Sequence, residues 1–201
     1  MTPDPSTEEL ALWRAAQGFD QLGALAADFI EGQLEFFPGW LAPDVDEETD
    51  ELVPTLATCN RSGFLTVASQ PGRLPHKGFG DHVFAQRAFV TGFAMPRAAD
   101  ALGALALDTE LVISAYPSTD VGGCRVPVSR RDDQVTAWAG QAAGPDELDI
   151  FAEVLGREAL AALRRSRYVS IIDPYWGQRD LLWESIAAAL ELPAHDGPRE
   201  T

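Results

Sequence analysis

Cysteine, basic residues and long apolar runs are all scarce in this 201-residue chain. The two cysteines, Cys59 and Cys124, lie in a chain with no export signal at its N-terminus, so we expect them to be reduced. No apolar run reaches the roughly 18–20 residues that span a bilayer. A chain of this length buries about 70% of its unfolded surface, so it needs neither a disulfide nor a metal to fold. Together these absences predict a cytoplasmic protein that makes no membrane contact.

The shortage of basic residues, 15 against 31 acidic ones, leaves a net charge of −16. Such a chain repels phosphate backbones, which argues against nucleic-acid binding. The charge is unevenly spread: residues 1–58 carry 13 acidic and one basic residue, whereas residues 59–140 carry seven acidic and eight basic ones. The acidic third either keeps the protein soluble or forms a surface for a basic protein partner. The nearly neutral middle third could hold a small anion.

Common catalytic signatures are also missing. The chain has no G-x-x-x-x-G-K-[ST], G-x-G-x-x-G, H-E-x-x-H, C-x-x-C or G-x-S-x-G motif. His76, Asp81 and His82 share one Gly-rich segment, which we interpret as a solvated loop rather than a metal site. Cys124 has no predicted base beside it and is not assigned as a nucleophile. We therefore predict no metal and no cofactor.

Hydrophobic periodicity predicts helices and strands around one sheet. The clearest helical pattern covers 20–31, where Leu22, Leu25 and Phe29 share a face. Pro54 is expected in the first turn of a helix that ends near Asn60. Other helices are expected at 8–17, 96–107, 145–163 (broken near Gly156) and 180–192, and strands at 64–68, 83–93, 111–116, 125–130, 134–138 and 168–172.

This order of elements predicts a single domain of the α/β or α+β class, with one mixed β-sheet of about six strands flanked by helices. Residues 1–58 are expected to form an acidic N-terminal helical segment packed on an α/β core at 59–192. Residues 193–201 are expected to fray. The sequence pattern does not indicate the oligomeric state.

Polar residues within apolar strands mark a candidate site. Gln86 and Arg87 are neighbours in the longest predicted strand, so they point to opposite faces. At least one of them must be partly buried and paired, because an unpaired polar group is costly inside a protein. Asp173, at the end of another predicted strand, is a natural partner for Arg87.

Ser69 and Gln70 end a predicted strand just before Pro71-Gly72, which suits a type II turn. Ligands of α/β sheets bind beyond the carboxyl ends of strands. Three interpretations remain open for the polar set: a structural network, a small-molecule pocket and a protein-partner surface. The candidate ligand-binding residues are Asn60, Arg61, Thr66, Ser69, Gln70, Gln86, Arg87, Asp173 and Trp176.

Three runs, CNRSGFLTVASQPG (59–72), QRAFVTGFA (86–94) and DPYWGQRDLLW (173–183), resemble an uncharacterised domain family of high-GC bacteria. The pattern of that family is N-R-x-G, T-x-x-S-Q-P-G, Q-R-A with G-F, and D-P-x-W-G with L-W. The resemblance covers roughly residues 10–185 and implies that the candidate residues form one set. It implies no activity, because the family has no established function.

We expect a polar pocket that binds, or processes, a small anionic metabolite or nucleotide. Arg61 and Arg87 would supply positive charge, and Trp176 would stack on a planar group. The alternative is an acidic, immunity- or inhibitor-like factor for a basic protein partner, which would use residues 44–51. Whether the protein is an enzyme stays open.

Overall fold

The computed structural model describes residues 6–40, 47–177 and 180–191. Part of the acidic run, Asp44 to Asp46, and the predicted frayed tail at 193–201 lie outside these residues. The six strands are β1 (Phe64–Lys77), β2 (Val83–Ala94), β3 (Val112–Pro117), β4 (Gly123–Arg131), β5 (Gln134–Gln141) and β6 (Arg167–Ile172). The seven α-helices of the described residues are α1 (Thr7–Ala15), α2 (Phe19–Ile30), α3 (Val53–Arg61), α4 (Pro96–Asp108), α5 (Gly144–Val154), α6 (Arg157–Arg164) and α7 (Leu181–Glu191).

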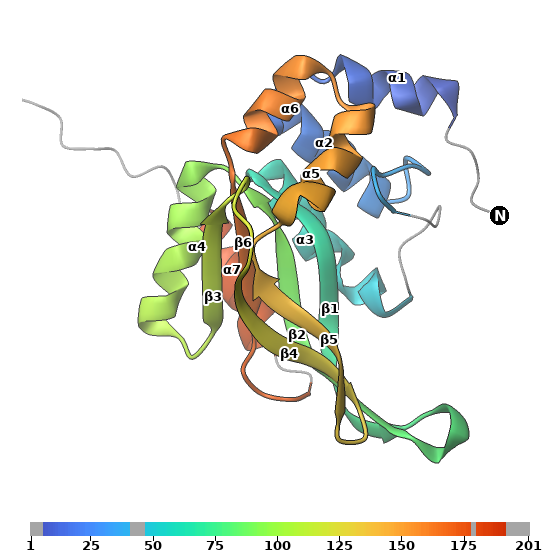
Figure 1. Cartoon of the computed structure of the whole chain (residues 1–201), viewed down its shortest axis with the longest axis vertical. Helices are drawn as coiled ribbons and strands as arrows, with labels where there is room; N and C mark the ends of the chain where they lie inside the picture. Colours follow the sequence, from blue (N-terminus) through green and yellow to red (C-terminus); the bar gives the residue numbers. More distant parts are fainter. Residues whose placement is uncertain (1–5, 41–46, 178–179, 192–201) are drawn as a thin grey trace, which may run out of the picture.

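β2 is the strand around which the sheet is arranged. The strand order is β3-β6-β2-β4-β5, and β1 pairs with β2. Residues 89–94 of β2 pair with β6, whereas residues 84–86 pair with β4. The far ends of the β1–β2 and β4–β5 hairpins therefore run together away from the helices (Figure 1).

The sheet confirms the expected six strands and makes the protein an α+β single domain. It is not mixed, however, because every strand pair is antiparallel and the parallel contact is an isolated bridge between Arg87 and Gly177. The β1–β2 and β4–β5 pairs are hairpins, and strands joined by such short turns must run antiparallel, whereas the other three pairs join strands that are far apart in the chain.

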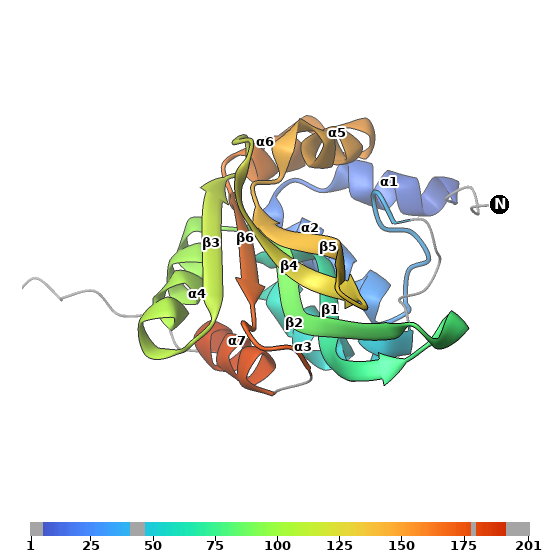
Figure 2. The same ribbon diagram turned by 60° about the horizontal axis from the view of Figure 1, so that its bottom comes forward.

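Helices cover both faces of the sheet, as the alternation of side chains along β2 and β6 requires. Phe93 and Tyr168 face a cluster built with α1, α2, α5 and α6, which includes Trp13, Leu22 and Phe151. On the other face, Val90, Val169 and Ile171 pack against residues of α3, α4 and α7. Figures 1 and 2 show α5 and α6 beside α1 and α2, with α4 and α7 beside β3 and β6.

The predicted break near Gly156 is confirmed, because α5 ends at Val154 and α6 begins at Arg157. A Cβ on Gly156 would lie 2.5 Å from the carbonyl oxygen of Arg14, so the junction packs directly on the end of α1. In the part of the chain that the structure describes, no helix combines the length and apolar character that crossing a membrane requires.

One predicted strand end is wrong. β1 does not stop at Ala68 but continues through Pro71 and Gly72 to Lys77, and Pro71 pairs with Ala88. Gly72 keeps the strand going with φ of +83°, a value that L side chains rarely adopt. The first half of the segment predicted as a Gly-rich loop at 73–82 is therefore strand, and a short 3₁₀ turn at Phe79–Asp81 follows it.

Candidate functional site

The structure places the nine predicted site residues in several different environments. Asn60 and Thr66 form a buried bracket between the end of α3 and the start of β1. Asn60 Nδ2 donates to Leu56 O (2.8 Å) and Thr66 Oγ1 (3.0 Å), while the Thr66 amide donates to Asn60 Oδ1 (2.9 Å). Asn60 is only 1% exposed, so this bracket orients the chain entering the sheet and has little polar capacity left for a ligand.

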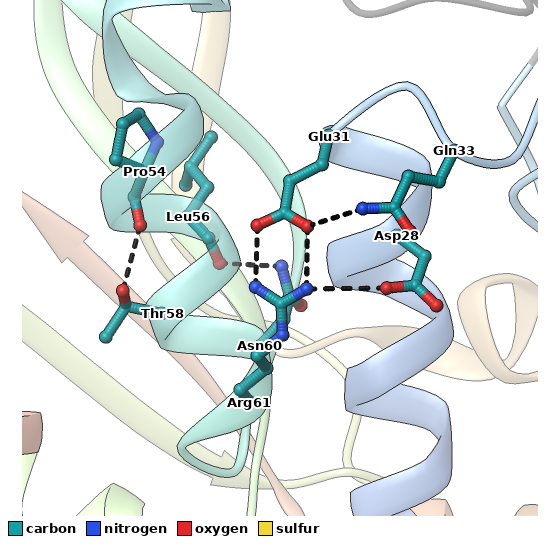
Figure 3. A network of polar contacts seen from close by, with 8 residues as sticks. All are labelled: Asp28, Glu31, Gln33, Pro54, Leu56, Thr58, Asn60 and Arg61. Atoms are coloured by element: carbon teal, nitrogen blue, oxygen red, sulfur yellow. Dashed lines mark hydrogen bonds and ion pairs between the residues drawn. The ribbon is translucent and has the colours of Figure 1, made fainter.

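Arg61 lies on the surface and joins two helices (Figure 3). Its Nη1 and Nη2 atoms donate to the two carboxylate oxygens of Glu31 at 2.6 and 2.7 Å, and Nη2 also contacts Asp28 at 3.4 Å. The hydrogen bond from Arg61 is the main reason that the pKa of Glu31 lies below its ordinary value. Arg61 thus fastens α3 to α2 and does not join the other predicted residues.

Ser69 lines a small cavity of about 60 Å³ between β1 and α2, together with Thr66 and the apolar side chains of Phe29 and Phe37. The prediction that Ser69 and Gln70 lie at the end of a strand fails because β1 continues past them. The rule about carboxyl strand ends also loses its basis, since it applies to open α/β sheets and this sheet is antiparallel.

Gln70 acts as a clamp between three strands. Its Nε2 donates to the carbonyl oxygens of Arg87 (2.8 Å) and Val128 (2.9 Å), and its Oε1 accepts from Ser129 Oγ (3.2 Å). Gln70 is buried, so these contacts hold β1, β2 and β4 in register where β2 changes its partner from β6 to β4. The clamp fixes the backbone of Arg87.

Arg87 and Arg130 both stack on the ring of Trp176. Their Cζ atoms lie 4.4 and 4.7 Å from its centroid. Arg87 Nη1 donates to Pro127 O (2.8 Å). Burial lowers the pKa of Arg87, the charge of Arg130 lowers it further, and Asp173 raises it. The charge of Asp173 thus favours the charged form of Arg87, as expected, whereas the nearby guanidinium of Arg130 disfavours it.

Residues 173–177 bring Trp176 to this place. The amides of Asp173 and Gly177 donate to the carbonyl oxygens of Ala88 (2.9 Å) and Gln86 (3.0 Å), which lays the segment along β2 after β6 has ended. A Cβ on Gly72 would lie 2.4 Å from Gly177 O. The glycine inside β1 therefore serves this close approach, which explains the Pro71-Gly72 pair better than a chain reversal does.

A cavity of about 210 Å³ adjoins the stacked arginines. Its walls include Arg73, Gln86, Ser129 and Arg130, so Arg130 belongs to the cavity as well as to the stack. Within the described ranges, the buried atoms Gln86 Oε1 and Arg87 Nε have no hydrogen-bond partner. Buried polar atoms are normally paired, so two such atoms within one cluster are notable.

The sequence did not single out Arg130 or Ser129. Both lie in a predicted hairpin strand. The sequence feature that pointed to this region was the charge of residues 59–140, where basic residues slightly outnumber acidic ones. Which residue of β4 meets Trp176 depends on strand register, and β4 has three irregularities in its pairing with β5.

The histidines of the hairpin tip form no metal cluster. His82 Nδ1 contacts Asp132 Oδ2 at 2.8 Å, and Asp132 Oδ1 accepts from the Val83 amide. No group of three or more His, Cys, Asp or Glu residues converges within the described residues. Cys59 is a free thiol buried in the core, which raises its pKa to about 12.

A model of the family described as "Domain of unknown function (DUF6919)" matches residues 8–192. The match covers most of the chain, so the chain belongs to this family. The match confirms the prediction of an uncharacterised domain family. No curated protein matches the chain.

Proposed function

We propose that this member of the family binds a small anion, a phosphate or carboxylate metabolite, between Arg87, Arg130 and the adjoining cavity. The observation that carries the proposal is the pair of guanidinium groups within 5 Å of one indole ring. Like charges this close repel each other, and the charge of Arg130 adds to the burial that is the main cause of the lowered pKa of Arg87. Natural sequences accept such local conflicts chiefly at functional sites.

An anion would remove the conflict. It would accept hydrogen bonds from Arg130, which lines the cavity, and its negative charge would offset the charges of both guanidinium groups. Arg73 and Ser129 in the cavity wall would add a further charge and a hydroxyl. The cavity of about 210 Å³ is below the usual range of about 300–1,000 Å³ for pockets that enclose a drug-sized ligand. It suits one anionic group rather than a whole nucleotide.

Arg130→Gln tests the proposal best, because Arg87 also supports the fold through Pro127 O. The matched control is Arg125→Gln, since Arg125 also belongs to β4 and stacks alone on Trp138 at 4.9 Å. Binding of inorganic phosphate, citrate and adenosine monophosphate would be measured by calorimetry and thermal shift at constant ionic strength. We expect Arg130→Gln to weaken anion binding about ten- to a hundredfold, while Arg125→Gln leaves it unchanged.

Without ligand, Arg130→Gln should be as stable as the wild-type protein or more stable, because the repulsion disappears. A purely structural network predicts the opposite, a less stable variant and no anion effect. The proposal fails if none of the three anions stabilises the wild-type protein, or if Arg125→Gln and Arg130→Gln lose binding equally.

A further inference from the structure

A third cavity, of about 150 Å³, lies between β1, α5 and the segment that follows α2, next to the small cavity beside Ser69. It shares no lining residue with the cavity beside Arg130. Four aromatic side chains contribute to its wall: Phe37, Trp40, Phe151 and Tyr168. The charged side chain of the wall is Glu147, in the first turn of α5.

Three of the four aromatic side chains in the wall pack against other rings of the core. Phe37 meets Phe151 edge-to-face with centroids 5.9 Å apart, and Phe93 packs in the same manner against Phe151 (5.6 Å) and Tyr168 (5.0 Å). These contacts come from α5, β2, β6 and the segment after α2, so the rings are fixed by the core itself. A ligand would find a preformed surface and would not have to order it.

Gly39 brings the segment carrying Trp40 onto α5. It has φ of +83°, and a Cβ at this position would lie 2.8 Å from Ile150 Cγ2. A larger residue would push the segment away from the helix and open the cavity. The glycine is therefore required for the wall.

Glu147 has no cationic neighbour among the residues that the structure describes. Burial, assisted by the neighbouring Asp146, raises the pKa of its carboxyl. Within the ranges that the structure describes, no basic side chain lies within 4.0 Å of this carboxylate and no donor forms a hydrogen bond with it. A partly buried carboxylate without a partner costs folding free energy unless a cation compensates it.

The chemistry of the wall selects the type of cation. A metal ion such as Ca²⁺ takes six to eight oxygen ligands, and one carboxylate cannot supply them. An organic ammonium instead gains from aromatic rings through cation–π contacts and from a single carboxylate through its charge. The acidic residues 1–58, with 13 acids and one base, would also attract a cation.

We propose that this cavity binds the head group of a small alkylammonium compound, with Glu147 as its counter-ion and Trp40, Phe37 and Tyr168 around its methyl or methylene groups. The proposal does not depend on the anion site. The volume suits a quaternary ammonium head group rather than a whole cofactor.

The test compares choline with 3,3-dimethylbutan-1-ol, which has the same shape without the charge. Binding would be followed by NMR titration of the full chain. We expect choline to bind the wild-type protein at least about tenfold more tightly than the alcohol. Glu147→Gln should remove most of this preference, and Trp40→Leu should weaken choline binding about tenfold. Asp149→Asn, an exposed acid on the same helix outside the cavity wall, should have no effect.

The folding of each variant is checked separately by thermal unfolding. Glu147→Gln removes a desolvated charge, so it should unfold at the same temperature as the wild-type protein or higher. Equal affinities for choline and the alcohol would overturn the proposal. It also fails if choline produces no saturable shifts in the wild-type protein, or if Asp149→Asn loses as much affinity as Glu147→Gln.

Discussion

Two glycines in helix interiors should respond in opposite ways to the same substitution. Gly23 lies in α2 and Gly103 in α4. A Cβ on Gly23 would lie 2.1 Å from the carbonyl oxygen of Asn60 and 3.0 Å from its carbonyl carbon, whereas a Cβ on Gly103 would meet nothing within 4 Å. The obstacle at Gly23 is the backbone of α3, which cannot move aside as a flexible side chain can.

The expected magnitudes follow from this geometry. In a free helix position, alanine is about 0.8–1.0 kcal/mol more favourable than glycine, so Gly103→Ala should stabilise the protein by nearly that amount. Overpacking costs about 1–3 kcal/mol, and occasionally more. A contact of 2.1 Å belongs at the upper end, so Gly23→Ala should destabilise the protein by about 2 kcal/mol after the helix gain is included.

Urea unfolding followed by circular dichroism measures the free energy of unfolding of both variants, and thermal unfolding measures their Tm. For a protein of this size, Tm should fall by about 4–8 °C for Gly23→Ala and rise by about 2–4 °C for Gly103→Ala. The urea dependence of the free energy should stay constant, which would show that the substitutions change stability and not the surface exposed on unfolding. If Gly23→Ala proves neutral or stabilising, the close α2–α3 contact at Asn60 is wrong.

Two further predictions concern residues that the sequence assigned to a ligand. Asn60→Ala should lower the free energy of unfolding by about 2–4 kcal/mol, because it removes three hydrogen bonds and leaves the buried Thr66 amide unpaired. Thr66→Val should lower it by about 1 kcal/mol. Urea unfolding of the two single variants and the double variant should show losses that do not add, because the two residues share a hydrogen bond. Equal losses for the two single variants would contradict the bracket. The depressed pKa of Glu31 means that its pairing with Arg61 stabilises the fold above the ordinary carboxyl pKa and is lost as the pH falls through the lowered value. Arg61→Gln should therefore lower Tm at neutral pH but not once Glu31 is protonated, and a Tm difference that persists in acid would refute this assignment.

The candidate set illustrates what sequence patterns can predict about a site. Gln86 and Arg87 were selected as polar residues within an apolar strand, and Trp176 because it shares the family pattern with Asp173; the structure stacks Arg87 on Trp176 and pairs Gln86 O with the amide of Gly177. Arg61 was predicted where a helix ends before a strand, and it lies at the end of α3 and pairs with Glu31. Glu31 is 30 residues away in the chain, so no local pattern could show that Arg61 serves this helix contact and not the site.

Local periodicity was sufficient for much of the fold. The apolar spacing of Leu22, Leu25 and Phe29 defined α2, and the alternation along 83–93 defined β2, because burying one face of an element imposes its own period on the sequence. The same reasoning failed at Pro71-Gly72. The conformation of Gly72 is explained by Gly177, a residue that only the tertiary structure brings close.

The sequence by itself thus determined a single domain of helices around a six-stranded sheet, and the family, since these depend on residues close together in the chain, while the choice between α/β and α+β came from the antiparallel strand pairing. Only the tertiary structure decided that Arg130 meets Arg87 over Trp176 and that Glu147 lies among Phe37, Trp40 and Tyr168. Both groupings arise from strand register and helix packing across the sheet. Those depend on contacts between distant residues, on which the periodicity of any single segment carries no information.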